Sequence, residues 1–165
     1  MKIGIILGST SDTPVAEKAF EVLKSLQIPF EAHCYSAHRT PFEAAEFSKN
    51  AKKNGFGVII AFAGMAAHLA GALAAHTTLP VIGVPCKGGA QDGMDALLST
   101  VQMPSGVPVA AVAINGGANA ALLAAQILSI SDEKLSLALQ DRKLKMQQDI
   151  LKQDSEFSKK YFFAP

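Results

Sequence analysis

The sequence predicts an α/β fold in which a doubly wound parallel sheet forms the middle of three layers. Two observations support this class. Short β-rich runs alternate with longer runs whose apolar residues recur at helical spacing. The short runs are apolar at nearly every position, which is typical of strands that are buried on both faces, as in parallel sheets. The 165 residues, 49% of them hydrophobic, suffice for one core and for a single domain spanning residues 1–165.

The first half of the chain alternates strand and helix three times. Thr40 is expected to cap the second helix, with Pro41 at its first position and Glu43 reaching back towards the cap. Gly55 is suited to end that helix. Strands are expected over residues 2–7, 30–35 and 58–62, and helices from Pro14 to about residue 26, over 41–54 and over 66–76.

The second half continues the same alternation and then ends in a long helix. Pro85 is expected to stop the fourth strand, and a glycine-containing loop is expected from Cys86 to Asp92. Ser131 is expected to cap the last helix, with Asp132 and Glu133 in its first turn. The remaining strands are expected over 81–84 and 109–114, and the remaining helices over 94–101, 119–128 and from residue 132 onwards.

The carboxyl-terminal segment, residues 130–165, differs in character from the rest of the chain. Leu135, Leu139, Met146 and Ile150 form a thin apolar stripe among charged and glutamine residues, and aromatic residues follow near the end. Such a helix either packs on its own domain or extends from it as an arm on a neighbouring subunit. The pattern leaves both possibilities open.

Composition excludes several classes of protein. The 15 basic and 14 acidic residues give a formal net charge of +1 without a basic stripe, which disfavours nucleic acid and anionic membranes as partners. Cys34 and Cys86 are expected to be free thiols of a cytoplasmic protein, and no export signal is predicted. The nearly uncharged run 58–75 is long enough to span a bilayer, but its change from β-branched to small residues favours a buried strand followed by a helix.

The stretch from Ser36 to Pro41 is the strongest candidate for a functional loop. It follows the second expected strand and precedes the amino terminus of a helix, so Ser36, His38 and Arg39 are held close together beside exposed backbone amides. A hydroxyl, a titratable imidazole and a guanidinium in such a place suit phosphate binding and a proton transfer.

Two further loops are expected at the same edge of the sheet. Parallel strands end at one edge, and ligands of open α/β sheets bind there. The first loop offers Ser9, Ser11 and the carboxylate of Asp12, which suit a phosphate and sugar hydroxyls, although an ordinary helix cap would also explain them. The third loop, residues 63–68, consists mostly of small residues whose amides can approach a ligand closely. Met65 is the exception there, and could either pack inward or cover the pocket.

Other kinds of site are disfavoured by the sequence. It has no G-x-G-x-x-G fingerprint and no P-loop, which argues against a dinucleotide or nucleoside triphosphate site. The four histidines lack paired spacing with other ligands, so no metal site is expected. His33 and His76 are expected to be structural. His68, expected inside the third helix, is either buried with a hydrogen bond or part of the pocket.

Six motifs in order resemble the PurE family of bacterial purine biosynthesis, over essentially the whole chain. They are GSTSD (8–12), SAHRTP (36–41), AGMAAHL (63–69), VIGVP (81–85), STVQMP with GVPV (99–104 and 106–109), and NAALLAA (119–125).

The resemblance implies a three-layer α/β fold and a homo-octamer in which the carboxyl-terminal helices pack on neighbouring subunits. It implies an isomerase, the N5-carboxyaminoimidazole ribonucleotide mutase, that needs no metal or organic cofactor. His38 would be the general acid and base. The other residues implied to bind substrate are Ser9, Ser36 and Arg39 at the 5′-phosphate, Asp12 at the ribose, and Ser11, Gly64, His68 and Leu69 around the base and carboxylate.

The sequence departs from the family pattern at three places. Met65 stands where glycine is usual, Ala70 where proline is usual, and the loop 86–92 is atypical, so contacts of that loop with the ligand are not assigned.

Two other functions are weighed against the mutase. The related carboxylase uses aminoimidazole ribonucleotide and free CO2, but that branch tends to have lysine at the position of Arg39 and to lack the Ala-Ala-His-Leu pattern. A non-enzymatic, flavodoxin-like module that binds a mononucleotide is disfavoured, because flavin sites usually offer aromatic faces and this chain has no tryptophan.

Overall fold

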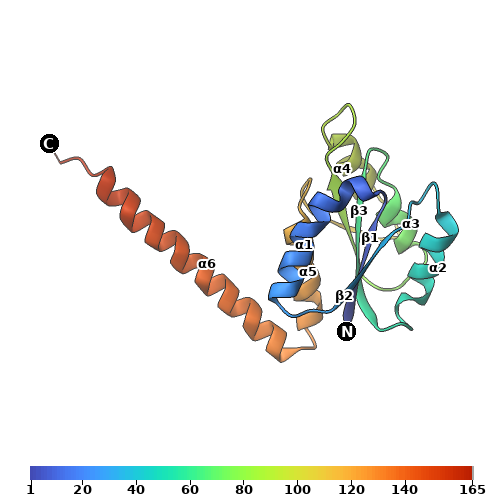
Figure 1. Cartoon of the computed structure of the whole chain (residues 1–165), viewed down its shortest axis with the longest axis horizontal. Coiled ribbons are helices and arrows are strands. Elements are labelled where there is room, and N and C mark those ends of the chain that lie inside the picture. Colours follow the sequence, from blue (N-terminus) through green and yellow to red (C-terminus); the bar gives the residue numbers. More distant parts are fainter. Residues whose placement is uncertain (165) are drawn as a thin grey trace. The chain divides into compact units, whose positions relative to one another are not determined.

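The computed structural model describes residues 1–164, which fall into two compact units, 1–128 and 129–164. Within the first unit, five strands form one sheet in which every neighbouring pair is parallel, in the order β2-β1-β3-β4-β5 (Figure 1). This confirms the predicted fold class. The strands are β1 (Lys2–Leu7), β2 (Phe30–Cys34), β3 (Phe56–Gly64), β4 (Val81–Cys86) and β5 (Ala110–Ala111).

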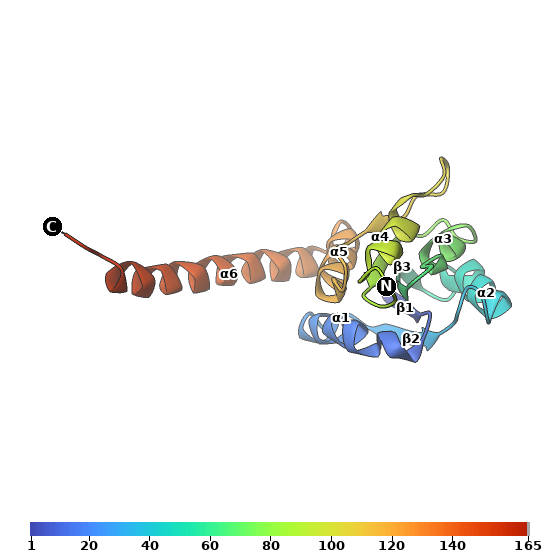
Figure 2. The ribbon, with the colours of Figure 1, turned by 90° about the horizontal axis from the view of Figure 1, so that it is seen from above.

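The helices of this unit cover both faces of the sheet. The helices α1 and α5 lie on one side, and α2 and α3 lie on the other (Figures 1 and 2). Gly117 at the start of α5 packs so closely on α1 that a Cβ there would collide with the carbonyl oxygen of Val15. The helices of this unit are η1 (Thr10–Asp12), α1 (Thr13–Ser25), α2 (Pro41–Ala51), α3 (Leu69–Ala74), α4 (Met94–Val101) and α5 (Gly117–Ser129).

The core lies along β1 and the middle strand β3, both of which the apolar runs predict as buried strands. Ile5 of β1 and Ile60 of β3 are paired in the ladder, and both are fully buried, as is Phe62. Burying each such side chain contributes roughly 1.5–3 kcal/mol relative to exposure. The sheet edge where these strands end is therefore held rigidly in place.

The prediction that Pro85 stops the fourth strand is wrong. β4 continues through Pro85, which pairs with Ala63 of β3, and on to Cys86. The carbonyl oxygen of Pro85 accepts a hydrogen bond from the N–H of Asn115 at 2.8 Å, on the side facing away from β3. The ladder with β5 has already ended on that side, so the missing N–H of Pro85 interrupts no strand pairing.

Both predicted helix caps differ in detail. Thr40 is the N-cap of α2, followed by Pro41 as predicted, but its side chain makes no cap hydrogen bond, because its Oγ1 accepts from the N–H of Ser36 at 2.8 Å. The long helix is capped by Asp132, whose carboxylate accepts from the N–H of Leu135 at 3.0 Å, and not by Ser131. A carboxylate competes well with a hydroxyl for this position.

Two predicted elements are shorter than expected. The fifth strand contains only Ala110 and Ala111 in place of 109–114. The third helix is Leu69–Ala74 in place of 66–76, so His68 is its N-cap residue and does not lie inside it. In both cases apolar residues extend beyond the element: Val112 and Ile114 after β5 are half-buried, and Ala67 before α3 is buried, without belonging to a strand or helix.

The second unit consists mainly of α6 (Glu133–Lys160), a helix of 28 residues. Its apolar side chains, including Ile150 and Phe157, are largely exposed, and the rings of Phe157 and Tyr161 contact each other at 4.5 Å between centroids. In the described part of the chain, no helix is both long enough and apolar enough to cross a membrane.

Candidate active site

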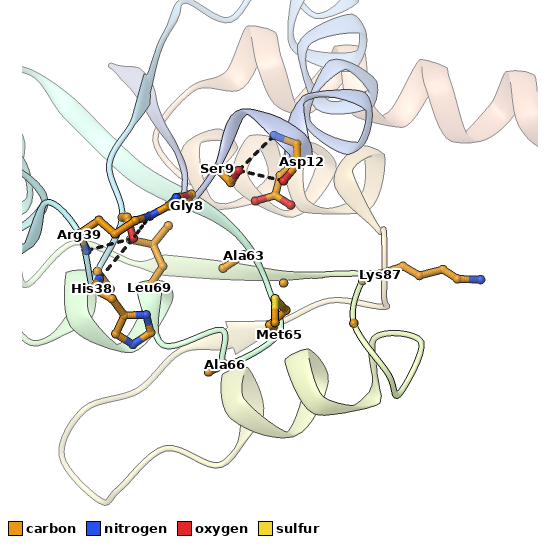
Figure 3. Close-up of a pocket in the computed structure, with 16 residues that line it drawn as sticks. Gly8, Ser9, Asp12, His38, Arg39, Ala63, Met65, Ala66, Leu69 and Lys87 are labelled. Carbon is orange, nitrogen blue, oxygen red and sulfur yellow. Dashed lines mark hydrogen bonds between the residues drawn. The ribbon is translucent and has the colours of Figure 1, made fainter.

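The loops that follow β1, β2, β3 and β4 surround one cavity of about 640 Å³ at the carboxyl edge of the sheet (Figure 3). This volume is in the usual range for a small-molecule site. Eight of the nine residues that the sequence proposes for catalysis or substrate binding line it, and His68 is the exception. The eight are Ser9, Ser11, Asp12, Ser36, His38, Arg39, Gly64 and Leu69.

The first loop is folded around the hydroxyl of Ser9. Its Oγ accepts hydrogen bonds from the N–H of Ser11 at 3.3 Å and from the hydroxyl of Ser11 at 2.9 Å. The N–H of Gly8 donates to the carbonyl oxygen of Phe62 at 2.8 Å, which fastens the loop to the end of β3. The loop leads through η1 into α1, and its residues Ser9, Ser11 and Asp12 line the cavity.

Asp12 is a buried carboxylic acid at the cavity wall, with 9% of its surface exposed. Burial raises its pKa, while hydrogen bonds from the backbone of Ser9 and the thiol of Cys86 oppose that rise. Cys86 is itself buried, and burial together with the neighbouring Asp12 raises the pKa of its thiol to about 12. The thiol of Cys86 is therefore protonated and not a nucleophile, and its Sγ donates to the carbonyl oxygen of Val84 at 3.6 Å.

The second loop is folded around the hydroxyl of Ser36. Its Oγ accepts from the backbone N–H groups of His38 at 3.3 Å and Arg39 at 3.2 Å, and from Nε of Arg39 at 3.4 Å. Nη2 of Arg39 donates to the carbonyl oxygen of Gly8 at 2.9 Å, as Figure 3 shows. The guanidinium thus connects the first loop to the second, a contact between residues 31 positions apart.

The two exposed imidazoles of His38 and His68 face each other. Nε2 of His38 lies 3.1 Å from Nδ1 of His68, and the rings are nearly perpendicular at 81°. One nitrogen must donate and the other accept, so the tautomers of the two rings are linked. His68 therefore reaches the site through His38. It is exposed, so the expected alternative of a buried, structural His68 is wrong.

The other two histidines lie away from the cavity. His33 stacks on Tyr35 at 5.2 Å between ring centroids, within β2 and the residues that follow it. His76 lies after α3, outside the cavity lining. Among residues 1–164, no group of histidine, cysteine and acidic side chains is arranged to hold a metal ion.

The third loop combines close backbone approach with one unusual residue. A Cβ on Gly64 would lie 3.2 Å from the carbonyl oxygen of Cys86, so glycine allows β3 and β4 to end side by side. Met65 has φ of +55°, in the left-handed region that favours glycine, and its side chain is 63% exposed at the cavity. Leu69, at the start of α3, is buried and forms an apolar part of the wall.

The loop after β4 also lines the cavity, which the sequence analysis left unassigned. The N–H of Lys87 donates to Oδ1 of Asn115 at 2.8 Å, and its ammonium group pairs with Asp92 at 2.8 Å. Gly88 and Gly89 complete this side of the cavity. A glycine pair one residue after a buried strand was the available signal, but it carries no chemistry of its own.

The fold and the cavity define a doubly wound α/β protein with a ligand site beside β1, at the point where the strand order reverses. The family model described as AIR carboxylase matches residues 2–149. The chain belongs to this family, as the sequence motifs predict.

Similar proteins of known name agree with the family. The chain is 51% identical over 156 residues to the N5-carboxyaminoimidazole ribonucleotide mutase of Bacillus subtilis, covering 93% of this chain and 96% of that one. It is 51% identical over 149 residues to the phosphoribosylaminoimidazole carboxylase of Saccharomyces cerevisiae, covering 90% of this chain but 26% of that one. The crystal structure of PurE from Treponema denticola matches with a TM-score of 0.83 at 29% identity, covering 93% of this chain and 96% of that one.

The raised pKa of Asp12 gives a prediction for stability. Because the folded protein holds this proton more tightly than the unfolded chain, the contribution of Asp12 to stability is fully present below its ordinary pKa of 3.8 and is lost as the pH rises through the raised value. We expect Asp12→Asn to melt at a higher temperature than the wild type at pH 7, with a smaller difference near pH 4. Thermal denaturation of both proteins between pH 4 and pH 7 measures this difference in melting temperature.

Glu17→Gln, which changes an exposed carboxylate on α1 outside the cavity lining, is the control and should show no such trend. A melting temperature of Asp12→Asn equal to or below that of the wild type at pH 7 would contradict the expectation.

Proposed function

We propose that this chain is an isomerase of purine biosynthesis that converts N5-carboxyaminoimidazole ribonucleotide to 4-carboxy-5-aminoimidazole ribonucleotide. The observation that carries the proposal is the position of His38, which lines the same cavity as the hydroxyl, carboxylate and guanidinium groups suited to a sugar phosphate. The relatives named as mutases support it, because they match this chain at about half identity over nearly their whole length.

The 5′-phosphate would bind between the first and second loops. Ser9 and Ser36 each use a hydroxyl oxygen as acceptor within their loops, which leaves the hydroxyl hydrogen to donate to a ligand. Arg39 uses Nε and Nη2 in the contacts described, out of five N–H donors, so it can still contact a phosphate. Asp12, deeper in the wall, would accept a hydrogen bond from the ribose.

His38 would move the proton that the reaction requires. When the bond from nitrogen to the carboxyl carbon breaks, CO2 leaves and its bonding electron pair stays on nitrogen, which takes a proton from His38. The ring carbon then attacks CO2 to form the new carbon–carbon bond, and the hydrogen on that carbon returns to His38. Histidine is the side chain that usually carries protons in general acid–base catalysis, so a single imidazole can serve both steps.

The remaining proposed residues would hold and orient the base. His68 fixes the ring of His38 through the 3.1 Å contact between their nitrogens. The amides around Gly64 would contact the carboxylate, and the hydroxyl of Ser11 would do so by turning from Ser9 Oγ to the ligand. Leu69 would pack on the heterocycle. We propose no metal or organic cofactor, because CO2 and the aminoimidazole need only proton transfer and proximity in one cavity.

The carboxylase that uses free CO2 is the second candidate. It is favoured by the yeast relatives that bear that name, but this chain spans about a quarter of their length, and those proteins are fusions. A flavin-binding module is a weaker third candidate, because no phenylalanine, tyrosine or tryptophan is among the described residues that line the cavity.

A carbon-labelled transfer assay tests the proposed reaction. We expect the wild type to form the carboxylated product from the N-carboxylated ribonucleotide without added bicarbonate. Product formed only from aminoimidazole ribonucleotide with bicarbonate would favour the carboxylase. In the same assay, His38→Asn should lower turnover by roughly 100-fold or more while still binding the product. Near-normal turnover of this variant would exclude His38 as the proton carrier.

Arg39→Ala should weaken the binding of phosphorylated ligands. A hydrogen bond to a charged group is worth about 1.5–3 kcal/mol, so we expect the Kd of the product to rise by roughly 10- to 150-fold. Arg39→Lys keeps the charge but loses the planar, two-pronged guanidinium, so its Kd should lie between those of the wild type and Arg39→Ala. Calorimetric titration measures the Kd. An unchanged Kd for Arg39→Ala would assign the phosphate to other residues.

We propose that the chain assembles as a homo-octamer in the cytoplasm, with α6 packing on neighbouring subunits. The exposed apolar side chains of α6 and the residues after it support an intersubunit role, since Ile150, Phe157 and Phe163 are each more than 60% exposed. Sedimentation of the purified chain should give about eight times the 17.3 kDa protomer mass. A monomer at micromolar concentration would contradict this assembly.

A further inference from the structure

Met65 combines an unfavourable backbone conformation with a position at the cavity. Four non-glycine residues in the described chain have positive φ, namely Gln27, Met65, Asp92 and Asn115, and of these Met65 alone lines the cavity. Asparagine and aspartate tolerate this region because a short polar side chain can hydrogen-bond locally, which methionine cannot do. The chemistry of Met65 itself therefore does not explain its conformation.

Packing in the core does not explain it either. The side chain of Met65 is 63% exposed, so little of its apolar surface is removed from water. It reaches towards the loop after β4, where a Cβ on Gly89 would lie 3.5 Å from its Cγ. Figure 3 shows Met65 between Ala63 and Ala66, across the cavity from Arg39. Backbone strain that neither burial nor local bonding offsets is typical of functional sites.

Met65 has a large side chain among small neighbours in the cavity wall formed by the loops after β3 and β4. From residue 63 to 66 the other cavity-lining residues are alanine and glycine, and across from them stand Gly88 and Gly89. Lys87, just before this glycine pair, also lines the cavity, but its ammonium group is paired with Asp92 at 2.8 Å. Apart from Lys87, no other side chain in these two segments is larger than a methyl group. Removing the side chain of Met65 would therefore open a gap between the loops after β3 and β4.

We propose that Met65 covers the part of the cavity that would hold the carboxyl group of the substrate. There its side chain slows the escape of CO2 between bond breaking and bond formation. This inference rests on the proposed mutase reaction. Arginine and serine groups can hold a carboxylate, but neutral CO2 offers them little charge to bind, so its retention has to be steric. A flexible thioether suits such a cover, since it can move aside for the nucleotide and then pack on it.

Loss of label during turnover tests the proposal. The N-carboxylated ribonucleotide carrying a ¹³C carboxyl group is converted in buffer equilibrated with unlabelled CO2, and the decay without protein is subtracted. Mass spectrometry of the product gives the fraction of label lost per turnover. We expect Met65→Gly to lose severalfold more label per turnover than the wild type, and Met65→Leu, which keeps the bulk, to lose about as little as the wild type.

Thermal melting separates this effect from a damaged fold. Met65→Gly should melt no lower than the wild type, because glycine adopts φ of +55° without strain. Equal loss of label in Met65→Gly and the wild type would overturn the proposed role of Met65 and leave the proposed function standing. A wild type that does not convert the N-carboxylated substrate would overturn the proposed function, and this inference with it.

Discussion

The site depends on the parallel pairing of β1 with both β2 and β3. This pairing brings Leu7 level with Cys34 on one side and with Phe62 on the other, so three loops leave the sheet at the same height. The bond from Gly8 to Phe62 and the bond from Arg39 to Gly8 then join neighbouring loops across the edge. Residues that are distant in the chain become neighbours because their strands are in register.

The sequence was sufficient for the features that follow from burial and topology. Apolar runs over β1 and β3 predicted a sheet covered on both faces, and the ends of those runs predicted which loops would meet. Ser9, Asp12 and Arg39 were predicted to lie near one another in this way, and all three line the cavity. Strand ends and polar residue types are both visible in the chain. The limits of α4, Met94–Val101, were also predicted correctly.

Features that depend on tertiary contacts could not be predicted. Pro85 belongs to a strand because β5 is too short to need its N–H, which no local pattern reveals. The contact between His38 and His68 joins residues 30 positions apart, and the strained backbone of Met65 depends on the paths of two loops. Gly88 and Gly89 were missed as lining residues because glycine signals a turn without signalling what the turn faces.

The contact between the two imidazoles also has a mechanical meaning. His38 follows β2 and His68 follows β3, and these strands do not touch, because β1 lies between them. The 3.1 Å contact therefore spans two strand spacings and holds only while both loops lean over the end of β1. A small outward shift of either loop would separate the rings and uncouple their tautomers, so the tautomer of each imidazole depends on how both loops are held.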